Sequence, residues 1–256
     1  MPRIRSAGRF LFGFMLVIAL TALASNAHAA AINYGDFSDI PPGAVMYLYV
    51  TESSGTDAVP LFGSPSITED TLDFDPKGFV AFSGSGGSDL TDGQLNFSIE
   101  TLPGAGISSI LFREGGDYSL LGTGTAGTMV AGGISVHVEI IEVDGVALPS
   151  PIDVFASASF SANLVSSPTT LSPWSNTLFV DFGPALANIP HNLGVTRANV
   201  VLDDLLAAIS EPLSTALIAK KDFTIIPTIE GNPIPEPASL ALFTLGAICV
   251  FRRGSR

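Results

Sequence analysis

The chain contains the run Gln94-Leu95-Asn96-Phe97-Ser98-Ile99-Glu100-Thr101, in which apolar and polar residues alternate strictly. Because successive side chains of a β-strand point to opposite faces, the apolar residues of this run share one face and the polar residues the other. Residues Ile134–Ile140 repeat the pattern. At Ile141 the parity breaks, which indicates a β-bulge or a strand buried on both faces. The basic unit of the fold is therefore a half-buried strand.

Shorter patterns of the same kind extend over most of the chain. They predict further strands at Val45–Val50, Gly78–Phe82, Ile107–Arg113, Tyr118–Leu121, Val154–Phe160, Leu178–Phe182, Val195–Leu202 and Ala216–Ile226. Turn-forming residues separate them at Pro41-Pro42-Gly43, Asp75-Pro76-Lys77-Gly78, Asp92-Gly93, Gly115-Gly116-Asp117, Asp144-Gly145 and Gly183-Pro184. About ten short strands with such turns are typical of an all-β fold, and we predict a two-sheet antiparallel β-sandwich, jelly-roll-like.

One stretch is ambiguous. Residues Asn199–Ile209 are rich in Leu, Ala and Asp and are compatible with a helix. The flanking segments on both sides have strand patterns, which favours a hairpin that turns near Asp203-Asp204.

The N-terminal residues 1–29 have the features of a secretory signal peptide, which the Sec translocon and signal peptidase would handle. Arg3, Arg5 and Arg9 precede the apolar run Phe10–Ala24, and Ala27-His28-Ala29 is a small-x-small cleavage site. The alternative is an uncleaved anchor helix, but the well-formed cleavage site favours removal after Ala29.

The charge of the remaining chain excludes several classes of partner. Of 24 acidic and 11 basic residues, the two terminal segments contain one acidic and six basic residues, which leaves a formal charge of −18 on the middle. Such a domain does not bind nucleic acid or anionic membranes without a bridging cation, which leaves solubility outside the cell or cation binding as the purpose of the charge. The sole cysteine, Cys249, lies near the C-terminus, so the middle has neither a disulfide nor a thiolate metal site.

The C-terminal residues 232–256 combine three features in a fixed order. Pro235-Glu236-Pro237 is followed by the uncharged run Ala238–Phe251 and then by Arg252, Arg253 and Arg256. Fourteen residues make a helix of about 21 Å, short of the roughly 30 Å hydrocarbon core, so the helix suits transient anchoring better than a permanent span. The arginines would stay cytoplasmic and stop translocation. An ordinary C-terminal membrane anchor is the alternative.

This tail resembles the PEP-CTERM sorting signal of Gram-negative bacteria. The resemblance implies that Pro235, Glu236 and Pro237 are recognised by an exosortase and that the chain is released or transferred to the cell surface. Four runs of the middle resemble uncharacterised secreted proteins of planctomycete-like bacteria and imply no activity: Asn33–Phe37, Tyr47–Glu52, Leu72–Pro76 and Ala219–Phe223. They favour a single domain over residues 30–231.

Some residues of the middle could bind a ligand. Asp70, Asp73 and Asp75 could offer oxygen ligands to Ca²⁺, but their spacing lacks a calcium-loop motif, which favours a solvated acidic turn. Trp174 could stack on a sugar ring if it is exposed, whereas a core position would make it structural. Thr123, Thr125 and Thr128 resemble part of the threonine ladder of an ice-binding face, but one short run cannot build a flat ladder, which favours a flexible Gly/Thr connection.

No enzymatic motif is present, and the many carboxylates single out no glycosidase pair. We therefore expect a non-enzymatic protein of the cell surface or extracellular matrix, without a cofactor except for the possible Ca²⁺. The alternative is a carbohydrate-binding module of the exopolysaccharide matrix, and a glycan-acting hydrolase or an ice-binding protein is more remote.

Overall fold

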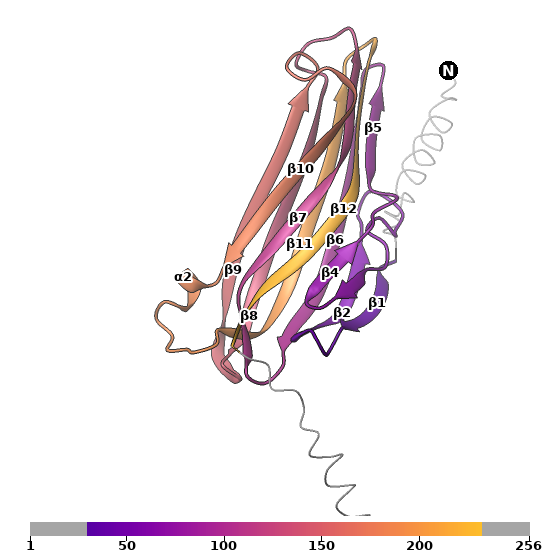
Figure 1. The fold of residues 1–256 in the computed structure, drawn as a ribbon. Coiled ribbons are helices and arrows are strands. Elements are labelled where there is room, and N and C mark those ends of the chain that lie inside the picture. The colour runs from indigo at the N-terminus through magenta and orange to yellow at the C-terminus, as the bar shows by residue number, and fades with distance from the viewer. Residues whose placement is uncertain (1–29, 232–256) are drawn as a thin grey trace, which may run out of the picture.

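The computed structural model describes residues 30–231. These residues form twelve strands and one short helix, α2 (Gly183–Leu186). The strands are β1 (Ile32–Ser38), β2 (Val45–Ser53), β3 (Ser66–Thr68), β4 (Thr71–Phe74), β5 (Val80–Gly84), β6 (Gly87–Thr101), β7 (Ala105–Gly122), β8 (Met129–Val143), β9 (Val146–Asn163), β10 (Thr169–Asp181), β11 (Val195–Ser210) and β12 (Ser214–Gly231). The longest of them run side by side along an elongated molecule (Figure 1).

The strands form two antiparallel layers. One layer has the order β1-β2-β6-β11-β8-β9. In the other, β10 pairs with β7, β7 with β12, and β12 with both β5 and β4, while β3 pairs with β4. A single bridging pair, Val195 with Ile107, joins the layers at one end. The predicted all-β sandwich is confirmed.

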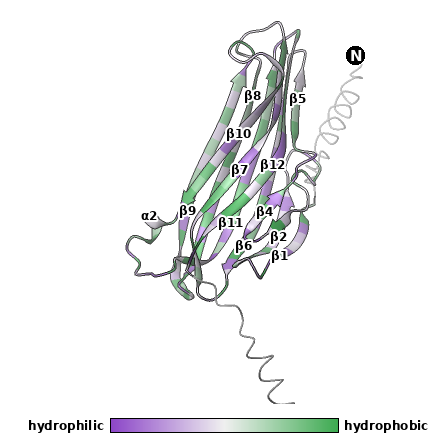
Figure 2. Cartoon of the chain, viewed as in Figure 1, coloured by the Kyte–Doolittle hydropathy of each residue, from purple (hydrophilic) through white to green (hydrophobic). Residues whose placement is uncertain are grey.

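The hydrophobic core lies between the two layers. Hydrophobic and hydrophilic residues alternate along the long strands (Figure 2), as half-buried strands require. At one level of the core the ring of Phe62 packs edge to face on Phe74, Phe79 and Phe223, and the rings of Phe74 and Phe223 are tilted against each other, with centroids 5.0–5.9 Å apart. Each fully buried phenylalanine contributes about 1.5–3 kcal/mol, so this cluster is a main source of stability.

The alternating runs form strands as predicted. Leu95 and Ile99 are fully buried in β6, and Val138 and Ile140 in β8. The pairing of β8 with β9 shifts register between Ile140 and Glu142, so the bulge predicted at Ile141 is confirmed.

The hairpin predicted near Asp203-Asp204 is wrong, because β11 continues without interruption through this point. Asp203 is exposed and accepts a hydrogen bond from the Gln94 amide, whereas Asp204 points into the core toward Lys220. The two aspartates therefore follow the ordinary alternation of a strand. The pair Asp203-Asp204 was interpreted as a turn because a carboxylate on the inward face of a strand is unusual.

Two further predicted turns, Asp92-Gly93 and Gly115-Gly116-Asp117, are also wrong. They lie inside β6 and β7, and β7 joins the two strands predicted at Ile107–Arg113 and Tyr118–Leu121. At Gly93 a Cβ atom would lie 2.6 Å from the Phe79 ring, and at Gly116 it would collide with the Ala219 carbonyl. These glycines permit close packing inside strands. The predicted turn at Asp144-Gly145 does connect β8 and β9.

Both terminal signals, residues 1–29 and 232–256, lie outside the described residues, and so do Pro235, Glu236, Pro237, Arg252, Arg253 and Arg256. Within residues 30–231 no helix is long and apolar enough to cross a membrane.

Candidate functional site

Side chains from four neighbouring strands gather on the outer surface of the six-stranded layer, which we call the open face. The strands are β9, β8, β11 and β6, in that order across the sheet (Figure 1). Register places the following residues in rows across this face: Asp153, Phe155, Ser157 and Ser159 of β9; Gly133, Ser135, His137 and Glu139 of β8; Asn199, Val201, Asp203 and Leu205 of β11; Asp92, Gln94, Asn96 and Ser98 of β6.

An exposed aromatic ring stands at one edge of the open face. Phe155 is 73% exposed, and its ring stacks on the imidazole of His137 with centroids 4.4 Å apart and planes within 9°. The His137 Nε2 atom is 2.7 Å from Asp153 Oδ1, which fixes the imidazole in place. One face of the Phe155 ring is thus held by the protein, and the other is free to contact a ligand.

Polar side chains on the neighbouring strands are held by one another. Asn199 donates to Glu139 Oε2 at 2.8 Å and accepts from the Ser98 hydroxyl at 2.7 Å. Gln94 donates to Asp203 Oδ1 at 2.7 Å. Because these groups are already oriented, little side-chain entropy is lost when a ligand binds to their remaining lone pairs and hydrogens.

A hollow of about 550 Å³ lies beside these groups on the open face. Hydroxyls of Ser135, Ser157 and Ser159 and the carboxylate of Asp203 line it, together with Leu205. Gly133, which also lines the hollow, has no side chain to fill the space. This size is within the usual range for small-ligand sites, about 300–1,000 Å³.

Asp92 at the margin of the hollow secures a loop. Its carboxylate accepts hydrogen bonds from the Thr56 hydroxyl at 2.6 Å and from the amides of Gly55 and Thr56 at 3.0 and 2.7 Å. Burial alone would raise the pKa of Asp92, but these hydrogen bonds to the charged form outweigh it and lower the pKa. Asp92 is therefore committed to holding the loop and is not offered to a ligand.

Trp174, the residue proposed from sequence for sugar stacking, lies in the core. It is 4% exposed, its ring packs on Phe160 with centroids 5.5 Å apart, and its Nε1 donates to the Ala219 carbonyl at 3.0 Å. In this position the ring offers no face to a sugar. The alternative given with the prediction, a structural role for Trp174 in the core, fits this position.

The three aspartates proposed for Ca²⁺ are not gathered into one group. Asp70 Oδ1 accepts hydrogen bonds from the Ala44 and Val45 amides, at 2.5 and 2.9 Å. Burial raises the pKa of Asp73, and the charges of Asp222 and Asp75 raise it further. In residues 30–231 no three or more His, Cys, Asp or Glu side chains are arranged to hold a metal ion.

The threonines of the short ladder are used internally. Thr125 donates to Glu211 through its amide and hydroxyl, and Thr128 is buried, with its hydroxyl 2.6 Å from that of Ser214. They form no exposed row on the described part of the chain.

Sequence reasoning missed the open face, although one signal was present. In Val154–Phe160 every second residue from Val154 is apolar, and Phe155 falls out of phase with them. A large aromatic residue at an outward position of a strand is such a signal.

Comparison with solved structures found weak similarities. The structure of TmCBM61 in complex with β-1,4-galactotriose is 11% identical, with 80% of this chain and 92% of that chain covered and a TM-score of 0.22. A carbohydrate-binding module of type CBM28, specific for non-crystalline cellulose, is 8% identical over 56% and 79%, with a TM-score of 0.20. A lectin from Bauhinia forficata in complex with GalNAc is 10% identical over 79% and 100%, with a TM-score of 0.21.

No curated protein matches the chain. A family model does match its end: residues 233–256 fit the PEP-CTERM protein-sorting motif. This match covers the tail whose resemblance was noted from Pro235, Glu236 and Pro237 and from the arginines that follow. The chain therefore carries the C-terminal sorting signal of exosortase substrates, which implies export and sorting to the cell surface or the extracellular space.

Proposed function

We propose that this is a non-enzymatic surface or matrix protein that binds polysaccharide through the open face. In this account the Sec translocon exports the chain, signal peptidase removes residues 1–29, and an exosortase cleaves at the C-terminal signal after transient anchoring by the tail. The all-β domain is then left outside the cell, where glycan binding would make it an adhesive component of the exopolysaccharide matrix.

The observation that carries the proposal is the exposed Phe155 ring beside the hollow. A pyranose has an apolar face of C–H groups and a rim of hydroxyls. The free face of Phe155 suits the first, and the hydroxyls of Ser135 and Ser157 with the carboxylate of Asp203 suit the second.

Charge narrows the class of glycan. The described part of the chain is strongly acidic, and the open face itself carries Asp153, Glu139 and Asp203. A polyanionic polysaccharide would be repelled at low ionic strength. The proposal therefore concerns neutral or amino-sugar segments.

The proposal is tested by filling the hollow. A Cβ atom at Gly133 would have the Ala158 carbonyl, 3.9 Å away, as its nearest neighbour, so larger side chains can be accommodated without disturbing the sheet. Gly133→Phe should abolish retardation of the full chain in gels containing the exopolysaccharide of the producing cells, whereas Gly133→Ala should retain it. Equal retardation of both variants and the wild type would refute binding at this hollow.

A further inference from the structure

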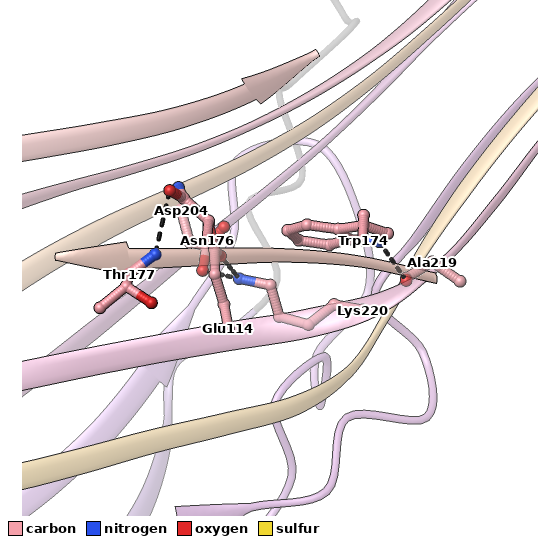
Figure 3. Close-up of polar contacts among 7 residues, drawn as sticks. All are labelled: Glu114, Trp174, Asn176, Thr177, Asp204, Ala219 and Lys220. Atoms are coloured by element: carbon pink, nitrogen blue, oxygen red, sulfur yellow. Dashed lines mark hydrogen bonds and ion pairs between the residues drawn. The ribbon is translucent and has the colours of Figure 1, made fainter. Parts of the chain in front are cut away.

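A lysine lies fully buried between the two layers of the sandwich (Figure 3). Lys220 of β12 is 1% exposed, and its Nζ contacts Glu114 Oε2 of β7 and Asp204 Oδ2 of β11. Both carboxylates are buried as well, at 3% and 2% exposure. One amine therefore faces two carboxylates in the interior, and the three groups come from three strands of the two layers.

Aromatic rings enclose the amine. The Lys220 Nζ lies 5.6, 4.9 and 5.3 Å from the ring centroids of Phe62, Phe79 and Phe223. These rings belong to the phenylalanine cluster of the core and exclude water from the three polar groups. A low-dielectric, dry environment strengthens the contacts among them but makes any uncompensated charge expensive.

The two carboxylates differ in how well they are satisfied. Glu114 Oε1 accepts a hydrogen bond from Asn176 Nδ2 at 2.9 Å (Figure 3), so both of its oxygens have partners. Asp204 Oδ1 is buried without any hydrogen-bond partner in the part of the chain that the structure describes. A buried, unsatisfied carboxylate oxygen is rare in native proteins and calls for an explanation.

We propose that Lys220 and Asp204 condense into an intramolecular isopeptide bond, with Glu114 acting as the proton carrier. The product is a neutral amide, so the charges of Lys220 and Asp204 disappear, and only the Glu114 carboxylate stays charged, with the Asn176 side-chain amide as a hydrogen-bond donor. The amide N–H then has Glu114 as its acceptor, and the orphaned oxygen of the carboxylate either leaves as water or becomes the amide carbonyl.

The reaction balances without any further reagent. A proton passes from the Lys220 ammonium to the Asp204 carboxylate, which yields a neutral amine and a neutral acid. The Nζ lone pair attacks Asp204 Cγ to form a C–N bond, and Glu114 takes a proton from the nitrogen. Glu114 returns this proton to a hydroxyl on Cγ, the C–O bond breaks, and one water molecule leaves. Glu114 ends the sequence as a carboxylate, as it began.

The electrostatics of the cluster support the first step. Burial lowers the pKa of Lys220 to about 8, against the opposing effect of the Glu114 charge and hydrogen bond. The neutral, nucleophilic amine is therefore far more accessible than for a lysine in water, where the pKa is about 10.4.

The bond would join β12 of one layer to β11 of the other. The only cysteine of the chain, Cys249, lies in the sorting signal, so no disulfide can serve this purpose in residues 30–231. A covalent link between the layers limits the freedom of the unfolded chain and resists separation of the sheets. This inference is independent of glycan binding, because it concerns the interior and not the open face.

Peptide masses test it directly. Trypsin digestion of the denatured full chain should release Ala198–Lys221 uncut after Lys220 and lighter than its linear mass by one water molecule, because both linked residues fall in this peptide. Fragmentation should place the ring between Asp204 and Lys220. Recovery of linear Ala198–Lys220 from the folded wild type would overturn the proposal.

Matched variants assign the roles. Glu114→Gln keeps the shape of the side chain but cannot carry the proton, so it should yield the linear peptide. Lys221→Gln changes an exposed neighbour that pairs with Asp117, and the internal ring should persist in it. A branched species joining Lys220 to the peptide that begins at Glu114 would overturn Asp204 as the reacting acid. A ring that still forms in Glu114→Gln would overturn the role of Glu114.

Discussion

Removal of the Phe155 ring should weaken glycan binding without unfolding the protein. Phe155 is 73% exposed, which corresponds to roughly 150 Å² of a ring side chain of about 200 Å². A sugar can cover one face only, because His137 stacks on the other. At about 25 cal/mol per Å² for roughly 75 Å², the ring contributes about 2 kcal/mol at most. We expect Phe155→Ala to raise Kd by roughly 5- to 30-fold.

The assay is isothermal titration calorimetry of the full chain with soluble fragments of the exopolysaccharide from the producing cells. Loss of the stack on His137 should cost no more than about 1.5 kcal/mol of stability. In a domain of this size that lowers Tm by no more than about 6 °C, so the variant remains folded.

Phe179→Ala is the matched control. Phe179 is 58% exposed and lies on β10 in the other layer, away from the open face. Its removal should leave Kd unchanged. An unchanged Kd for Phe155→Ala, or an equal loss in both variants, would refute the role of the Phe155 ring.

Three further predictions concern stability. Trp174→Ala should cost about 3–5 kcal/mol of stability and lower Tm by roughly 6–20 °C, because the ring is buried. Calorimetry on the folded fraction of this variant should show an unaltered Kd for glycan. Weaker glycan binding by the folded fraction would restore a direct role for Trp174. Glu52→Gln should lose about 1–3 kcal/mol of stability in urea unfolding, because the buried Glu52 carboxylate accepts hydrogen bonds from the backbone amides of Leu61, Phe62 and Gly63. The glutamine side chain has only one acceptor oxygen, so one of these bonds is lost. Unchanged stability would contradict this reasoning. Asp92→Asn should lower Tm at neutral pH. Because the folded pKa of Asp92 lies below its unfolded value, the stabilisation by its carboxylate is present above the unfolded pKa and is lost as pH falls through the folded pKa. The difference in Tm between the wild type and Asp92→Asn should therefore shrink below about pH 4. A Tm difference that stays constant with pH would show that the Asp92 charge is not its cause.

Strand positions were predictable because alternation is a local property. Leu95 and Ile99 in β6, and Val138 in β8, fall on the buried face as their spacing predicts. At Ile141 the break in parity left a bulge or a strand buried on both faces as alternatives, and the register shift shows that it is the bulge. The way in which strands distant along the chain pair, such as β6 with β11, could not be derived from local patterns.

The wrong turn predictions fall at glycine and aspartate residues, because both residue types occur in turns and also inside strands. Gly145 has a positive φ and forms a turn, whereas Gly93 and Gly116 sit where neighbouring atoms leave no room for a Cβ atom. Only tertiary structure distinguishes the two uses. The cluster of Lys220, Asp204 and Glu114 left a clearer trace, because each residue is in phase with the buried apolar residues of its strand. Charges at three inward positions predict buried ionic groups, but only the tertiary structure shows that these three side chains contact one another.

The open face and the buried cluster would serve one purpose in a protein sorted to the outside of the cell. Phe155 and the hollow would provide attachment to the matrix, and the bond from Lys220 to Asp204 would hold the two layers together under load. Each has its own experiment, so failure of one leaves the other standing.

The most direct measurement for the proposed function is the mapping of backbone amide shifts by NMR as polysaccharide fragments are added to the isotope-labelled protein. The account predicts that the amides of Phe155, Ser157, Ser135 and Asp203 shift with a common saturation curve, while those of β10 and β12 do not. Saturable shifts confined to β10 or β12, or no shifts at fragment concentrations that saturate the calorimetric signal, would contradict glycan binding at the open face.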